Sequence, residues 1–161
     1  MKILAIDPGT NKSGWVHLDE SGTVIGSGID DNEDVRELLR SSRHDYYAIE
    51  WIESFGMPVG QAVFETVWWC GVFSEVVVAE LHRVTRREVK LHLCNSARAN
   101  DANVRQALID KYLGKGGGKT PQIGTKARPG PLYGIKSHMW SALAVGVTFL
   151  ETNKIKVGLH E

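Results

Sequence analysis

Two acidic residues each end a short apolar segment. Asp7 closes the run 2–7, and Glu50 closes the run 46–50. A carboxylate at the inner end of a buried strand is poorly solvated, so it requires a cation or a hydrogen-bond donor. If the two strands are parallel neighbours, both acids lie at the sheet edge where α/β folds bind ligands. Asp7 alone has a simpler interpretation, because an aspartate before Pro8 and Gly9 can cap its own turn.

A histidine and a serine near the end of the chain are the next candidates. His138 and Ser141 are three residues apart, so they share one face of any helix that contains them. Neutral imidazole ligates metal ions, although a lone histidine at this place is ordinarily a core or capping residue. Carboxylates with one imidazole favour Mg²⁺ or Mn²⁺. Asp7 and Glu50 are therefore candidate ligands of such an ion, whereas for His138 taken alone the core or capping role is the default.

The pattern of apolar residues predicts an α/β fold in a single domain covering 1–161. Alternation and turn residues predict a mixed five-stranded sheet, three antiparallel strands followed by parallel ones, flanked by helices. The strands are expected at 2–7, 13–18, 23–29, 46–50 and 86–93. The helices are expected from an N-cap within 30–32 up to 41–42, at about 61–84, at about 101–113, and from about 137 onward.

The expected helix 61–84 is apolar nearly all round. Its larger side chains cannot share one sheet-facing stripe, since Val63, Val67 and Phe73 fall on a different face from Phe64, Trp68 and Val76. Either this helix is central to the core, or its second apolar face meets another copy of the chain. We expect a homodimer, with Trp69 and Phe73 as outward positions.

Charge is unevenly distributed although the formal net charge is zero. Residues 1–80 hold 5 Lys or Arg and 14 Asp or Glu, whereas residues 81–136 hold 12 and 3. A basic second half fits a polyanionic partner unless the two halves interleave in space. The stretch 114–136 lacks acids and is rich in glycine, which predicts a flexible basic loop. The candidate phosphate contacts are Arg98, which precedes this stretch, and five residues within it: Lys115, Lys119, Lys126, Arg128 and Lys136.

Phe55 and Met57 follow Glu50 on a segment containing glycine and proline. Such apolar side chains pack in a core or, on an exposed loop, insert as a wedge between bases.

Several protein classes are excluded by the sequence. No signal peptide or membrane-spanning run is present, and Cys70 and Cys94 lack metal-type spacing, so we expect a cytoplasmic protein with reduced thiols and no membrane partner. The segment 114–120 imitates a phosphate-binding loop, but Leu113 occupies the place of its first glycine and a helix is expected before it. We therefore expect no nucleotide cofactor.

The segment Ala5-Ile-Asp7-Pro-Gly9-Thr10, with Gly14-Trp15 after it, resembles two families. One is the actin-like ATPases, which need two such domains, and the chain holds one. The other is the RuvC-like Holliday junction resolvases, of cellular or phage type. That resemblance extends to the segments 48–50, 95–104 and 137–144.

The resemblance to the resolvases implies a ribonuclease H-like fold and paired symmetric nicks in four-way DNA junctions by a homodimer. It implies two Mg²⁺ or Mn²⁺ ions per site, with Asp7 bridging both, Glu50 on one, and His138 on the other or on the water. Ser141 departs from the pattern, because the family has an aspartate there; Glu53 or Asp101 is a candidate substitute.

The departure at Ser141 leaves two other functions open. The chain is either a catalytically weakened protein that binds branched DNA, or a nuclease of the same fold acting on other branched DNA or RNA. The expected location is the cytoplasm of a bacterial cell or of a phage-infected host.

Overall fold

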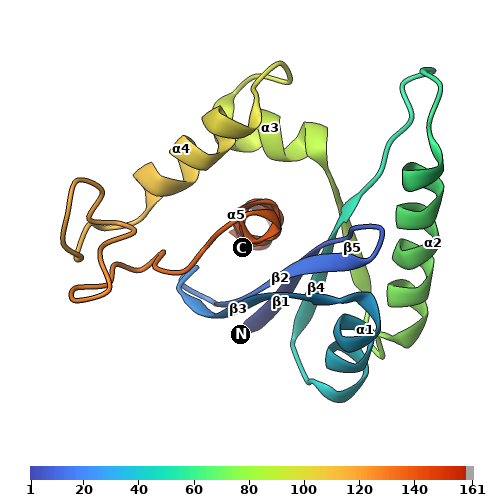
Figure 1. Ribbon diagram of the computed structural model, residues 1–161, viewed down its shortest axis with the longest axis horizontal. Coiled ribbons are helices and arrows are strands. Elements are labelled where there is room, and N and C mark those ends of the chain that lie inside the picture. Colours follow the sequence, from blue (N-terminus) through green and yellow to red (C-terminus); the bar gives the residue numbers. More distant parts are fainter. Residues whose placement is uncertain (159–161) are drawn as a thin grey trace.

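A computed structural model describes the backbone of residues 1–158 and the side chains of residues 1–153. One mixed sheet with strand order β3-β2-β1-β4-β5 lies between two helical layers (Figure 1). The strands are β1 (Lys2–Asp7), β2 (Lys12–Asp19), β3 (Val24–Asp31), β4 (Tyr46–Trp51) and β5 (Leu81–Thr85). The helices are α1 (Asn32–Ser41), α2 (Gln61–Val76), α3 (Arg86–Cys94), α4 (Asp101–Lys111) and α5 (His138–Gly158).

The sheet has the predicted topology. β1, β2 and β3 pair antiparallel, whereas β4 pairs parallel with both β1 and β5. The predicted α/β class and five-stranded mixed sheet are therefore confirmed.

Alternation along β1 assigns its side chains to two cores. Leu4 and Ile6 pack with α1 and α2, whereas Ile3 and Ala5 pack in the larger core formed with α3, α4 and α5. Because successive side chains point to opposite faces, the next residue, Asp7, falls on the α5 face. The same alternation acts in β4, where Ala48 belongs to the α5 core and Ile49 to the other. The strand period thus directs both terminal acids to one face.

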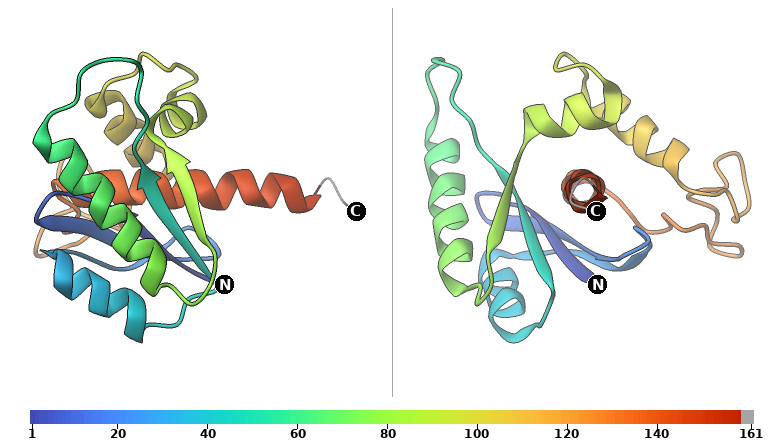
Figure 2. Two further views of the ribbon diagram at one scale, coloured as in Figure 1. Left: turned by 90° about the vertical axis from the view of Figure 1, so that its right-hand side faces the viewer. Right: turned by 180° about the vertical axis from the view of Figure 1, so that it is seen from behind.

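Helix α5 crosses the middle of the sheet (Figure 2). Gly146 allows the close approach, because a Cβ there would lie 2.8 Å from Leu18 Cδ1 and 3.0 Å from Ala5 Cβ. Glu151 then joins three helices, accepting from Lys111 Nζ at 3.0 Å and contacting His92 Nε2 at 2.5 Å. Although α5 has 21 residues, no helix in the described part of the chain combines the length and apolar character that a bilayer crossing needs.

Two expected elements differ from the structure. The segment 81–84, predicted as the end of a long helix, is strand β5, and the predicted strand 86–93 is helix α3. The run of three valines at 76–78 favours extended backbone, and α2 ends at Val76. Helix α3 is nucleated by a capping box, in which Thr85 Oγ1 accepts from the Glu88 amide and the Glu88 carboxylate accepts from the Thr85 amide.

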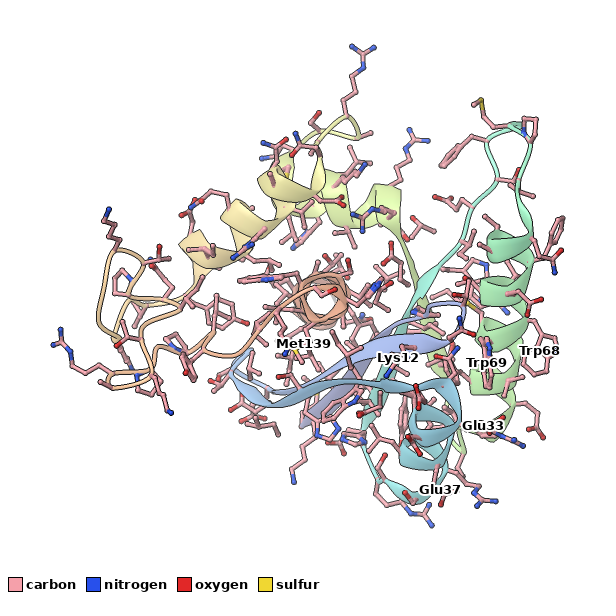
Figure 3. The ribbon with its side chains drawn as sticks, in the orientation of Figure 1. Lys12, Glu33, Glu37, Trp68, Trp69 and Met139 are labelled. Carbon is pink, nitrogen blue, oxygen red and sulfur yellow. The ribbon has the colours of Figure 1, made fainter. Side chains whose placement is uncertain are left out.

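The faces of α2 also differ from the prediction. Phe73 is fully buried with Cys70 against the sheet, so its expected outward position is wrong. Trp69 is half-buried against Phe73, with ring centroids 5.6 Å apart. The exposed apolar stripe consists of Phe64, Val67 and Trp68, and Figure 3 shows Trp68 on the outer side of the helix. The helix therefore has one sheet-facing stripe and one solvent-facing apolar stripe.

The basic segment 114–136 has a defined path. Backbone hydrogen bonds join Gly117 to Arg128 at 2.9 Å and Gly130 to Ile123 at 2.9 Å. Leu132 is buried in the α5 core, which anchors the segment immediately before α5. The five basic side chains of the segment are all exposed. It is thus a compact, anchored loop with a basic surface.

Candidate active site

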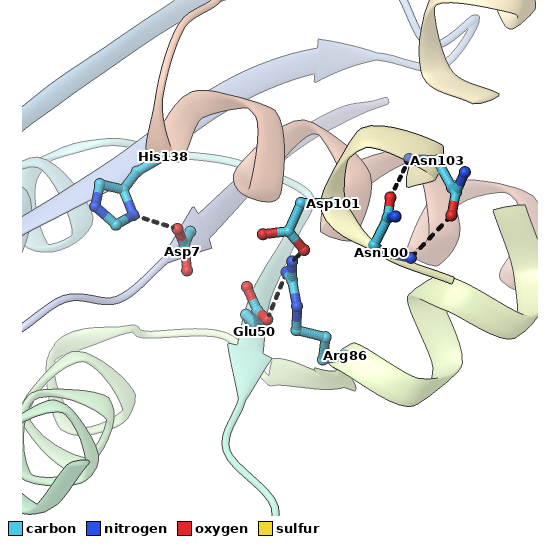
Figure 4. A network of polar contacts seen from close by, with 7 residues as sticks. All are labelled: Asp7, Glu50, Arg86, Asn100, Asp101, Asn103 and His138. Atoms are coloured by element: carbon cyan, nitrogen blue, oxygen red, sulfur yellow. Dashed lines mark hydrogen bonds and ion pairs between the residues drawn. The ribbon is translucent and has the colours of Figure 1, made fainter. Parts of the chain in front are cut away.

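Asp7 and Glu50 meet at one edge of the sheet. β1 and β4 are parallel neighbours in a register that pairs Ile6 with Ile49, so the acids that follow them lie side by side. The two carboxyl groups lie near each other (Figure 4), and the charge of Glu50 raises the pKa of Asp7. The two strand-terminal acids thus lie at the same sheet edge, as expected, and their holding of a metal ion stays a prediction.

His138 reaches this pair from the first residue of α5. Its Nδ1 lies 2.8 Å from Asp7 Oδ2. Ser137, just before it, has φ +45°, a left-handed conformation that is costly for a residue with a side chain. Gly14 pairs with Asp7 in the sheet, and a Cβ there would lie only 2.6 Å from the His138 backbone carbonyl. The glycine therefore creates the space in which His138 approaches Asp7.

A buried polar cluster fixes the turn after Asp7. Ser13 Oγ donates to Asn32 Oδ1 at 2.6 Å, and Asn32 Nδ2 donates to the Gly9 carbonyl at 2.9 Å. The Gly9 amide in turn donates to Ser13 Oγ at 3.2 Å. Ser13 and Asn32 are almost completely buried, so these bonds have little competition from water. This cluster was not predicted from the sequence. Its signal is a polar residue, Ser13, at a position of the strand that is buried.

Arg86 and Asp101 complete the polar network. Arg86 Nη1 lies 3.2 Å from Glu50 Oε1, and its Nη2 donates to Asp101 Oδ1 (Figure 4). Glu50 and Asp101 together raise the pKa of Arg86 although burial opposes this, so the guanidinium stays charged. The sequence analysis missed Arg86, because it was assigned to a strand rather than to the start of α3.

Burial and the neighbouring carboxyl group change the acidity of Asp7. Desolvation, then the charge of Glu50 and the hydrogen bond shared with it, raise the pKa of Asp7 from 3.8 to about 9, and Arg86 only partly opposes them. The pair therefore holds a proton near neutral pH unless a cation neutralises it.

The donor types at this edge fit a hard divalent cation. Two neighbouring and mostly buried carboxylates repel each other, and a bound Mg²⁺ or Mn²⁺ would remove that repulsion. The imidazole of His138 adds a nitrogen ligand. Among the side chains that the structure describes, no three such ligands are already arranged as a complete metal site. The residues therefore match the metal in chemistry, and metal binding requires their side chains to rearrange.

The other predicted residues are distributed around this edge and beyond it. Ser141 lies one turn after His138 on α5 and is half-buried. Phe55 and Met57 are 71% and 73% exposed on the loop between β4 and α2, so they are not core residues. Glu53 is also exposed on this loop, whereas Asp101 lies within the network.

The basic candidates are less closely grouped. Lys115 lines a cavity of about 360 Å³ with Ser21, Gly22 and Thr23, at the opposite end of the sheet from Asp7. Lys136 precedes the first residue of α5 by two positions, next to the site in the chain. Arg98 lies in the turn between α3 and α4, three residues before Asp101. The structure thus places Lys115 away from the acids.

Replacing Gly14 with alanine tests the contact between His138 and Asp7. The added methyl group has no room beside the His138 backbone, so the start of α5 must shift. We expect the catalytic activity of this site to fall by roughly a hundredfold, because small displacements of catalytic groups have effects of that size. Gly26→Ala is the control, since its new Cβ meets neighbours only at 3.7 Å or more. Equal activity of the two variants in a single-turnover assay contradicts a role for this contact.

Comparison with solved structures finds the same arrangement of elements in RuvC. The structure of Thermus thermophilus RuvC matches with a TM-score of 0.66 at 17% identity, covering 96% of this chain and 96% of that one. T. thermophilus RuvC in complex with a Holliday junction substrate matches with a TM-score of 0.68 at 17% identity, covering 97% and 96%. No protein-family model and no curated protein matches the chain. The chain therefore has a RuvC-like fold over almost its whole length.

Proposed function

We propose that the protein is a metal-dependent endonuclease that resolves four-way DNA junctions by paired, symmetric nicks. The observation that carries this proposal is the meeting of Asp7, Glu50 and His138 at one sheet edge of a RuvC-like fold. A fold alone hosts many functions, so the argument depends on the site. Carboxylates and an imidazole at this place suit hydrolysis of a phosphodiester.

The mechanism assigns the binding of Mg²⁺ or Mn²⁺ to Asp7, Glu50 and His138. When bound, the metal supplies Lewis-acid stabilisation of the phosphate and an activated water. The Ser13–Asn32 cluster holds the turn after Asp7 and so orients its carboxylate. His138 keeps Asp7 in a fixed position through its Nδ1 contact. The metal dependence expected from the sequence remains a prediction for this chain.

DNA contacts are proposed for two surfaces. Phe55 and Met57 lie exposed on the loop that follows Glu50, where apolar side chains can separate stacked bases. The basic side chains of the loop 114–136, together with Arg98, contact phosphates. A homodimer, formed through the exposed stripe of α2, presents two sites to the two strands that must be cut. Such junctions arise in the cytoplasm of a bacterial cell or phage-infected host, where we propose that the protein acts.

The test is cleavage of a synthetic four-way junction by the purified protein with Mg²⁺ or Mn²⁺. We expect paired nicks at symmetric positions, and no cleavage with a chelator. Flap, duplex and RNA–DNA hybrid substrates of matched sequence serve as controls. Preference for one of these over the junction indicates a nuclease with another substrate. Tight junction binding without cleavage indicates a weakened protein, an alternative favoured by the neutral Ser141 in place of an acid.

The basic loop offers a separate prediction. Replacing Lys115, Lys119, Lys126 and Arg128 together with glutamine is expected to flatten the dependence of junction affinity on salt, because each lost phosphate contact removes about 0.7–0.9 from the log–log slope. Binding is measured by fluorescence anisotropy over a range of salt concentrations. A double variant of Arg40 and Arg43 near the end of α1 is the control. An unchanged slope in the loop variant shows that the loop does not bind phosphates.

A further inference from the structure

Arg86 occupies an unusual place in the polar network. It is the first residue of α3, and its guanidinium lies between Glu50 at the end of β4 and Asp101 at the start of α4 (Figure 4). Its two terminal nitrogens contact one carboxylate each. Glu50 has only 14% of its side chain exposed and Arg86 35%, so the pair is partly shielded from solvent. A fixed cation is therefore part of the carboxylate centre.

The stability of helix α3 does not explain why a positively charged residue stands at position 86. The first turn of a helix favours negative charge, and a positive side chain there costs about 0.3–1 kcal/mol. The capping box of Thr85 and Glu88 already satisfies the helix start without Arg86. Residues that break a local preference in this way are expected at functional sites. The position of Arg86 is consequently explained by the carboxylates it contacts rather than by its helix.

The small number of free acids at this centre also bears on the role of Arg86. Ser141 leaves α5 without the acid that the RuvC-like pattern has there, and one oxygen of Glu50 is already committed to Arg86. Asp7 contacts Glu50 and His138, and no three ligands in the described part of the chain form a complete metal site. These donors suffice for one divalent ion once their side chains rearrange. The remaining acid of this centre in the described part of the chain, Asp101, is bound to Arg86 through Oδ1.

We propose that Arg86 supplies the positive charge that a second metal ion provides in a two-metal nuclease, so that this centre takes one divalent ion and Arg86 contacts the scissile phosphate. The inference rests on the proposed nuclease function. It replaces the two metal ions per site that the resemblance to the resolvases implies with one metal ion per site. Asp101 is a positioning residue, which holds the guanidinium by its Nη2 edge.

The chemistry of arginine fits this role. The planar guanidinium has five N–H donors in a fork, of which Glu50 and Asp101 use one each, so donors remain for phosphate oxygens. It keeps its charge at all working pH values. In the hydrolysis, a water oxygen forms a bond to phosphorus and loses a proton to solvent, while the bond between phosphorus and O3′ breaks. The 3′ oxygen keeps the electron pair and takes up a proton. Arg86 stabilises the negative charge that grows on the non-bridging oxygens during this exchange.

The test combines a metal count with single-turnover nicking. Mn²⁺ binding to the whole protein is measured by electron paramagnetic resonance, and we expect one ion per chain in the unmodified protein and in Arg86→Gln. Nicking by Arg86→Gln should fall by roughly a hundredfold or more, as for loss of one preorganised donor. Arg86→Lys should recover part of the rate, because it retains the charge but not the fork. Asp101→Asn should lower the rate by about tenfold without changing the metal count.

The neighbouring Arg87 provides a matched control. It is exposed on the same helix, so Arg87→Gln should retain full nicking and the same metal count. Thermal melting of each variant separates loss of function from loss of fold. Two Mn²⁺ ions per chain in the unmodified protein, or full nicking by a folded Arg86→Gln, overturns the inference while leaving the nuclease proposal intact. Absence of both Mn²⁺ binding and nicking in the unmodified protein overturns the nuclease proposal, and this inference with it.

Discussion

Replacing Asp7 with asparagine is expected to abolish DNA nicking while junction binding is kept. Asp7 is the most central acid of the site, since it contacts both Glu50 and His138. An amide has nearly the same shape but cannot balance the charge of a divalent cation. Loss of metal stabilisation worth several kcal/mol lowers the rate by roughly a thousandfold or more. Single-turnover nicking and anisotropy binding measure the two effects separately.

The same substitution is expected to make the metal-free protein more stable. The pKa of Asp7 is raised to about 9 in the folded state, above its value of 3.8 in model compounds, so the folded state binds more protons between these values. The free energy of unfolding therefore falls as pH rises through this window, and below it the effect disappears. Asparagine cannot ionise, so the melting temperature of Asp7→Asn should exceed that of the unmodified protein by several degrees at pH 8 and converge with it near pH 4.

An exposed aspartate provides the control for both measurements. Asp34 lies on the surface in the first turn of α1, away from the carboxylate centre. Asp34→Asn should leave nicking unchanged and produce no pH-dependent gain in stability. Full nicking by Asp7→Asn removes Asp7 from the mechanism. If the melting temperatures of Asp7→Asn and the unmodified protein differ by the same amount at pH 4 and at pH 8, burial of the Asp7 charge is not costly.

The pair of carboxylates could be predicted because it depends on local patterns. An apolar run followed by an acid occurs twice, at Asp7 and Glu50, and strand alternation directs both acids to one face. His138 could be proposed from its motif, but its contact with Asp7 depends on the close approach of α5 over Gly14. That approach is set by packing between segments more than a hundred residues apart. A periodic pattern carries no information about it.

Arg86 shows why the rest of the site could not be predicted. The segment 86–93 alternates polar and apolar residues at several positions, which favours a strand, and the competing helix signal is the capping box of Thr85 and Glu88. If the segment 86–93 were a strand, nothing would direct the Arg86 side chain toward Glu50. The network with Asp101 also joins the starts of two helices, which only tertiary packing brings together.

The faces of α2 illustrate a different limit. Its apolar residues occupy most of the helix circumference, so the sequence does not indicate which stripe meets the sheet. The structure selects Cys70 and Phe73 for the sheet and leaves Phe64 and Trp68 exposed, at 59% and 58%. The prediction of a second apolar surface survives, but the residues that form it differ.

Placing a charge in the exposed stripe of α2 is expected to abolish paired cleavage. Phe64, Val67 and Trp68 are spaced as neighbours on one helix face, which is the pattern of a helix that packs on a partner. Exposed apolar groups of this kind mark interaction surfaces. A twofold dimer through this stripe carries two sites in matching orientation, as two symmetric strands require. Trp68→Glu or Phe64→Glu should therefore give folded monomers.

The consequence for cleavage can be measured on a supercoiled plasmid with an extruded cruciform. A dimer cuts both strands within one binding event and gives linear product, whereas a monomer gives nicked circles because its two cuts are uncoupled. Trp68→Glu should shift the product from linear to nicked and reduce junction affinity, since two basic surfaces no longer converge on one DNA. Ala62→Glu places the same charge on α2 outside the stripe and should behave as the unmodified protein. If the unmodified protein sediments as a monomer at micromolar concentration and still yields linear product, pairing through α2 is not the source of coupled cleavage.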